Sequence, residues 1–172
     1  LNHVNSINYI NNLTRKNYNY IEKHERNCTI GDINYSFVTL ESQGKTKRLI
    51  LFKRKKNLFG EAVKSVSVAV AFYLSNNGNL KTKEEIGISC FFPTSDSFGL
   101  PFRCHAPFLL TSNRQNIKED PFNRKLIDIL ADTAAEAVKI LTTEKNDKKQ
   151  PLINDNILDM IKDAYYFSFG KI

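Results

Sequence analysis

Three runs of β-branched and aromatic residues lie between residues 35 and 74, and they restrict the possible folds more than any other feature of the chain. Runs 35–40 and 48–52 flank Gly44, a residue that readily adopts the positive φ of a tight turn, so they predict a hairpin. The third run, 66–74, alternates strongly between apolar and small or polar residues, which is typical of a strand. These runs predict neighbouring strands of one sheet.

Further runs extend this predicted sheet. Residues 76–79, with the sequence Asn-Asn-Gly-Asn, suit a turn, and the run 86–92 after them reads as a fourth strand that stops at Pro93. Alternation at 7–10 and 18–21 predicts two short strands joined by a polar turn, and 102–110 predicts a strand at an edge or with a bulge because of Pro107. We therefore expect a mainly antiparallel sheet of four or more strands.

The last third of the chain has helical periodicity. Asp120 and Pro121 form a helix start, because Asp accepts hydrogen bonds from first-turn amides and Pro at the first position loses none. Apolar residues at three-to-four-residue spacing predict a helix over 122–143, followed by a polar linker and a shorter helix from Asp155. The expected fold class is α+β, with the sheet backed by both helices. The expected parts are N-terminal strands at 1–27, a core at 28–144, and a linker with the C-terminal helix at 145–172.

The composition fits a folded chain with one core. Apolar residues make up 41% and aromatic residues 11% of its 172 residues. Three cysteines without CxxC spacing indicate a reducing compartment, and neither a leader nor an apolar run long enough to span a membrane is present. We therefore expect a cytoplasmic location, no membrane partner, and, from the apolar-polar start at Leu1, a domain excised from a longer protein.

Few side chains suggest chemistry of their own. Cys104 and His105 are neighbours on a predicted strand, so they should point to opposite faces and cannot form a catalytic pair. The histidines are too far apart for a zinc site, and glycines are not grouped as phosphate-binding loops require. Ser95, Asp96, Ser97 and Ser112 have no partnered base, and Glu84, Glu85, Glu119 and Asp120 read as solvated or capping residues. We expect no complete catalytic site and no metal site in this chain.

Positive charge is densest over residues 45–56, in the predicted hairpin. The net charge is +7, which can attract an anionic partner such as nucleic acid. Lysines that discourage association between sheet edges explain the same pattern equally well. The candidate nucleic-acid contacts are Lys45, Lys47, Arg48, Lys53, Arg54, Lys55 and Lys56.

The polar stretch 111–118 joins an apolar strand to the capped helix and carries Arg114 in its middle. Loops between rigid elements often carry function, and the planar guanidinium of Arg suits paired hydrogen bonds to a phosphate. The alternative is an ordinary loop Arg that caps a helix or forms a local salt bridge.

The order of features from 90 to 126 resembles a known family. Segments 90–94, 99–102 and 105–117, followed by Asn123 and Leu126, resemble the region after the ATP-binding domain in sacsin-like and related bacterial proteins of the GHKL ATPase superfamily. Segment 110–117 is also similar to the catalytic loop in the middle domain of the ninety-kilodalton heat-shock chaperones. In the chaperones this Arg directly follows a Ser, whereas here Asn113 separates Ser112 from Arg114.

This resemblance implies a transducer-type fold, similar to the second domain of ribosomal protein S-five. It implies that Arg114 reaches the γ-phosphate of ATP, with Gln115 and Lys118 as secondary candidates; the chaperones have Gln at the position of Lys118. ATP and Mg would be held by a preceding N-terminal domain, the main partner, with a client protein or nucleic acid as further partners. Since the superfamily's Mg-ATP motifs are not in these residues, this chain alone is not expected to bind or hydrolyse ATP. A plain interaction domain, with the aromatic C-terminal helix as its contact surface, is the remaining alternative.

Overall fold

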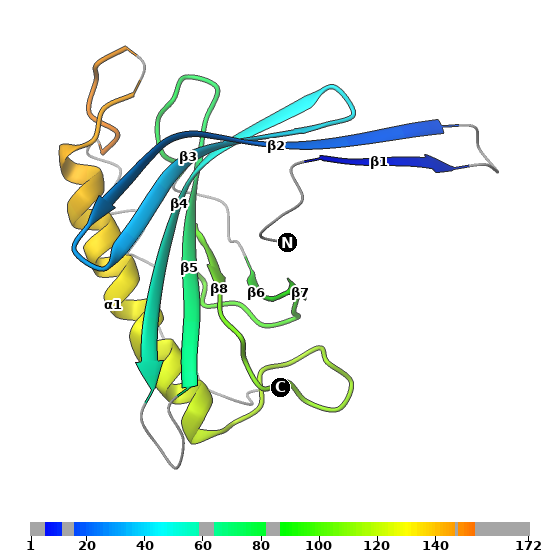
Figure 1. Cartoon of the computed structure of the whole chain (residues 1–172), viewed down its shortest axis with the longest axis vertical. Helices are drawn as coiled ribbons and strands as arrows, with labels where there is room; N and C mark the ends of the chain where they lie inside the picture. The colour runs from blue at the N-terminus through cyan, green and yellow to red at the C-terminus, as the bar shows by residue number, and fades with distance from the viewer. Residues whose placement is uncertain (1–5, 12–15, 59–63, 82–86, 147, 154–172) are drawn as a thin grey trace.

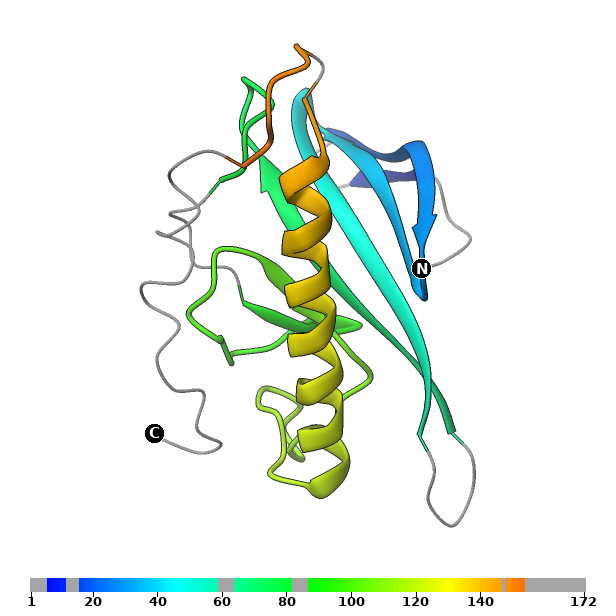
Figure 2. The ribbon, with the colours of Figure 1, turned by 90° about the vertical axis from the view of Figure 1, so that its left-hand side faces the viewer.

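In the computed structural model, the described residues are 6–11, 16–58, 64–81, 87–146 and 148–153. They form an α+β fold in which one sheet of eight strands packs one of its faces against a single long helix (Figure 1 and Figure 2). The fold class expected from the sequence is therefore confirmed at this level.

The strand order in the sheet is β1-β2-β3-β4-β5-β8-β6-β7. Strands β1 to β5 pair antiparallel with their chain neighbours, β8 pairs antiparallel with β5, and β6 pairs parallel with β8. The sheet is therefore mixed rather than antiparallel throughout. The strands are β1 (Ser6–Asn11), β2 (Lys16–Ile30), β3 (Ile33–Ser42), β4 (Lys45–Leu58), β5 (Lys64–Leu74), β6 (Ile88–Cys90), β7 (Phe92–Pro93) and β8 (Arg103–His105).

The predicted hairpin is confirmed as β3 and β4. Ser42 pairs with Lys45 across a turn in which Gln43 and Gly44 have φ of 51° and 72°, the two positive values of a type I′ turn. The third predicted run is β5, and a turn follows it in which Gly78 has φ of 80°. In these places the local sequence determines the local structure.

Two predicted strands are shorter than their apolar runs. The run 86–92 is broken at Phe91, whose φ of 61° ends β6 and turns the chain back as β7, so Pro93 lies within β7 and not beyond the strand. Of the run 102–110, only Arg103–His105 pairs as a strand. The apolar residues beyond it are used in packing, since Ala106 and Phe108 are buried in the main core.

The predicted N-terminal strands are confirmed as β1 and β2. Strand β2 continues to Ile30, with a register shift between Glu25 and Asn27, so the expected boundary between residues 27 and 28 falls inside one strand. In Figure 1 the β1–β2 hairpin extends away from the helix, over the side of the sheet that the helix leaves uncovered.

Helix α1 (Pro121–Thr143) confirms the predicted helix and its start, because the Asp120 side chain accepts a hydrogen bond from the Phe122 amide. Its buried face packs against β4 and β5 in the main core, where the rings of Phe52 and Phe72 lie 5.8 Å apart edge to face. The fully buried core residues of the sheet and helix include Ile50, Phe52, Val68, Val70, Leu126 and Leu141.

The segment after α1 folds back onto the domain instead of leaving it. Lys145 forms an isolated β-bridge with Pro151, and Leu152 is 1% exposed. Glu144, at the end of the helix, is buried and accepts hydrogen bonds from Tyr35 and Arg26. The part expected to be a linker is therefore packed onto the domain at Asn146 and Leu152, which are both buried. The predicted C-terminal helix from Asp155 lies outside the described residues.

Candidate functional site

Arg114 lies at the tip of a tight turn between the end of the β8 segment and α1. Its amide donates to the Thr111 carbonyl at 2.8 Å, and the Thr111 amide donates to the Asn116 carbonyl at 2.9 Å. The Asn113 side chain accepts from the Gln115 amide at 3.1 Å and from the Thr111 hydroxyl at 2.6 Å. Arg114 has φ of 59° and is exposed. The turn therefore holds this residue in one backbone conformation and directs its side chain to solvent.

Asn123 closes the base of this turn from the first part of α1. It is fully buried, and its amide group donates to the carbonyls of Leu109 and Lys118 at 2.8 and 2.7 Å, while its oxygen accepts from the Leu109 amide at 2.8 Å. Lys118 also donates its amide to Leu109 at 2.9 Å. Because a buried amide is stabilising only when its polar atoms are bonded, this arrangement fixes both ends of the loop to the helix.

Asp96 holds the side of the turn from a distant segment. One of its oxygens accepts from the Ile117 amide at 2.5 Å and the other from the Asn116 side chain at 3.1 Å. The neighbouring Ser95 amide donates to the Gln115 carbonyl at 2.7 Å. The loop is thus supported from α1 below and from segment 95–96 beside it.

The guanidinium of Arg114 has no hydrogen-bond or ion-pair partner among the described residues. It borders an open groove of about 560 Å³. Phe91 and Phe92 of this groove are 76% and 79% exposed, and Leu109 is 41% exposed. The other lining residues are Cys90, Pro93, Phe108, Leu110, Thr111 and Ser112. An ionised, unpaired donor therefore stands beside an exposed apolar surface.

The two secondary candidates hold the loop through their backbones. Gln115 and Lys118 both have exposed side chains, and their backbone groups make the contacts to Ser95, Asn113, Leu109 and Asn123. Neither residue belongs to the lining of the groove beside Arg114. The structure brings the three candidates onto one loop but not into one contacting cluster.

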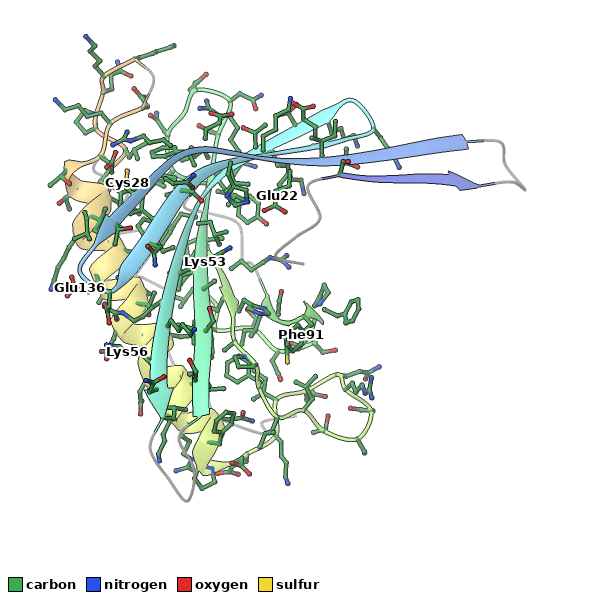
Figure 3. All side chains as sticks on the ribbon, in the orientation of Figure 1. Glu22, Cys28, Lys53, Lys56, Phe91 and Glu136 are labelled. Carbon is green, nitrogen blue, oxygen red and sulfur yellow. The ribbon has the colours of Figure 1, made fainter. Side chains whose placement is uncertain are left out.

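The basic residues of β4 are divided between the two faces of the sheet. Arg54 lies on the helix side, is 9% exposed, and bonds to Asp32 at 2.9 Å and to Thr133 of α1. Lys56 pairs with the same Asp32. The hydrogen bond from Lys56 is the main cause that lowers the pKa of the Asp32 carboxyl, and the bond from Arg54 lowers it further. Arg48 shares their face, while Lys45, Lys47, Lys53 and Lys55 share the other, because successive side chains of a strand alternate. Figure 3 labels Lys53 and Lys56 on this strand.

Cys104 and His105 point to opposite faces of the sheet, as expected from their adjacent positions on one strand. Cys104 is buried in the main core, and burial raises the pKa of its thiol to about 12. His105 is on the opposite face, where desolvation is the main cause that lowers the pKa of its imidazole. Across the described ranges, no group of three or more His, Cys, Asp or Glu side chains is arranged to hold a metal ion.

The roles of two residues that shape the site were not predicted from the sequence. Asn123 lies three residues before Leu126, on the apolar face of the helix. A polar residue on that face indicates a buried side chain with hydrogen-bond partners, and this signal was available in the sequence. Asp96 gives no such signal, because its partners are twenty or more residues away along the chain.

No protein-family model, curated protein sequence or solved structure matches this chain. The described part of the chain contains no helix that is both long enough and apolar enough to cross a membrane.

Proposed function

We propose that this chain is a transducer-type domain of a GHKL-type ATPase, which supplies Arg114 to the γ-phosphate of ATP bound by a preceding domain. The observation that carries the proposal is the position of Arg114: exposed, without a partner among the described residues, and fixed on a turn supported from two sides. The alternative of a loop Arg that caps or pairs locally finds no such contact in the described structure.

The rigidity of the turn suits this role. A cation stabilises the charge that spreads over a transferring phosphoryl group most effectively when little reorganisation is needed to place it. Asn123 and Asp96 fix the backbone on both sides of Arg114, so only its side chain has to be ordered when a phosphate arrives. Arg also presents a planar fork that can bind two phosphate oxygens at once.

The groove beside Arg114 offers a surface for the domain that would hold the nucleotide. Phe92 and Leu109 expose apolar area next to the guanidinium, and adjacent exposed apolar residues commonly mark a contact surface. Docking of that domain on the groove would bring its triphosphate to Arg114. Contact between the cation and the phosphate would then couple hydrolysis to the relative motion of the two domains. Mg and the nucleotide would be bound by the preceding domain.

The test is Arg114→Asn in the polypeptide that includes the ATP-binding domain. Asn removes the charge but accepts positive φ better than most residues, so the turn should be retained. We expect ATP binding to change little and the turnover number to fall more than about tenfold, which corresponds to at least ~1.4 kcal/mol in the transition state. Arg114→Lys should restore part of the rate, since it keeps the charge and loses the fork.

Lys125→Gln is the matched control, because it removes an exposed cation from α1 away from the groove. It should leave turnover at the level of the unmodified protein. A turnover number that is unchanged in Arg114→Asn would rule out the assignment.

A further inference from the structure

The face of the sheet opposite α1 carries a cross-strand row of polar side chains. Lys53 of β4 pairs with Ala69 of β5, Ala69 with His105 of β8, and His105 with Ser89 of β6. Residues directly opposite each other in a sheet share a face, so these four side chains lie on the same side.

The next row on this face brings in Arg103. It pairs with Ala71, which in turn pairs with Leu51. Arg103 Nη1 donates to the Ser89 hydroxyl at 3.0 Å, whereas its buried Nε has no partner. Buried polar atoms are nearly always bonded, so this Nε is a donor that a bound anion can use. Arg103 is held in place by Ser89 and yet keeps hydrogen-bonding capacity that the described residues do not use.

The charge on this face has one sign from β3 to β6. Among the described residues of β3, β4, β5, β8 and β6, none of those on this face is Asp or Glu. Farther out on β2, Glu22 is paired with His24. The cations on this face are Lys45, Lys47, Lys53, Lys55 and Arg103. With the overall charge of +7, this arrangement complements an extended anionic partner.

An exposed aromatic ring stands at the rim of the same face. Phe91 is 76% exposed, and its ring lies 5.7 Å from that of His105, edge to face. Figure 3 shows Phe91 projecting from the β6–β7 region, on the side of the sheet away from the helix. Its φ of 61° lies in the left-handed region, which is strained for a bulky residue. Strain of this kind, which exposes an apolar ring, is typical of binding sites.

We propose that single-stranded nucleic acid binds at the end of this face near β8 and β6, with its phosphates along Lys53, Lys55 and Arg103 and a base stacked on Phe91. Cations that follow a backbone next to an aromatic platform are the recurring means of binding single strands, because every base has a face that can stack. A duplex keeps its bases paired and would use only the charges. The residues of this surface other than Phe91 lie apart from the groove that Arg114 borders, so the inference does not depend on the proposed ATPase role.

The test is fluorescence anisotropy of the chain with fluorescein-labelled oligonucleotides of about 20 nucleotides: oligo-dT, oligo-U and a duplex of equal length. We expect both single strands to bind more tightly than the duplex. For each phosphate contact, the logarithm of the affinity should fall by about 0.7 for every tenfold rise in salt concentration. The oligo-dT and oligo-U arms distinguish DNA from RNA. Tighter binding of the duplex would overturn the proposal. Equal displacement by poly-glutamate would also overturn it, and would indicate an acidic protein partner.

Two variants separate the charge from the stacking. Lys53→Gln with Lys55→Gln should lower the salt slope by about 1.4, the value for two lost phosphate contacts. Phe91→Asn should leave the slope unchanged and weaken single-strand binding at least about fivefold, while Asn accepts the positive φ. Lys125→Gln with Lys139→Gln, which removes two lysines from α1 on the other side of the sheet, is the matched control. The proposal is wrong if this control weakens binding as much as the Lys53 and Lys55 pair does, or if both open-face variants bind like the unmodified chain.

Discussion

The Asp96 carboxylate accepts a hydrogen bond from the Ile117 amide at 2.5 Å, and this contact ties the segment after β7 to the loop that carries Arg114. The second Asp96 oxygen bonds to the Asn116 side chain, so both oxygens serve the same loop. The position of Arg114 therefore depends on a residue far from it in the sequence.

Asp96→Ala should loosen this loop. Ile117 is buried, and the substitution leaves its amide without a hydrogen-bond acceptor. We therefore expect the free energy of unfolding, measured by urea denaturation, to fall by about 1–3 kcal/mol. Amide hydrogen exchange of residues 115–117 should become faster. Asp128→Ala, an exposed carboxylate on α1, is the control and should change stability by less than about 0.5 kcal/mol. Unchanged exchange in Asp96→Ala would show that the turn is held without this carboxylate.

Arg114→Gly separates stability from phosphate contact. Gly relieves the cost of φ near 59°, about 1–2 kcal/mol, but gives the unfolded chain more freedom, which costs about 0.5–1 kcal/mol. The free energy of unfolding should therefore stay the same or rise by up to about 1.5 kcal/mol, as measured by urea denaturation. ATP turnover in the longer polypeptide should still fall as it does in Arg114→Asn. A loss of stability would mean that the side chain makes a structural contact.

Tyr35→Phe tests the buried bond to Glu144. Burial, followed by the hydrogen bond to Glu144, raises the pKa of Tyr35 above its ordinary value near 10. The folded state keeps the phenol proton at a pH where the unfolded state loses it, so this contribution is complete below pH 10 and is lost as pH rises above it.

Two measurements check this prediction. At pH 7, Tyr35→Phe should lower the free energy of unfolding by about 1.5–3 kcal/mol, the range for a hydrogen bond to a charged group. Between pH 9 and 11, the variant should lose less stability than the unmodified chain. Parallel pH curves for Tyr35→Phe and the unmodified chain would contradict the raised pKa.

The cysteines should differ in reactivity. Cys90 and Cys104 are buried, and burial raises the pKa of both thiols, whereas Cys28 is partly exposed. Because the thiolate is the reactive form, Ellman's reagent at pH 8 should label Cys28 first and the other two only on unfolding. Cys28→Ser should remove the early phase, and an early phase that persists in this variant would show that the core opens readily.

The sequence by itself determined the features that depend on neighbouring residues. The β3–β4 turn follows from Gly44, and the start of α1 follows from Asp120 and Pro121, because turns and caps are made by hydrogen bonds within a few residues. The apolar periodicity around Leu126 and Leu130 likewise predicted which face of the helix is buried. Arg114 could be singled out for the same local reason, as a cation in a polar connection between two apolar elements.

Only the tertiary structure decided how distant segments meet. The placement of β8 between β5 and β6, the break at Phe91, and the roles of Asp96 and Asn123 depend on contacts between segments well separated in the chain. The charges of β4 illustrate the same point, since one run of lysines and arginines is divided between the buried Arg54 on the helix side and Lys53 on the other face. Alternation along a strand separates the two sets, but which face becomes covered is decided by where the helix packs, because burial of apolar surface is a property of the whole fold.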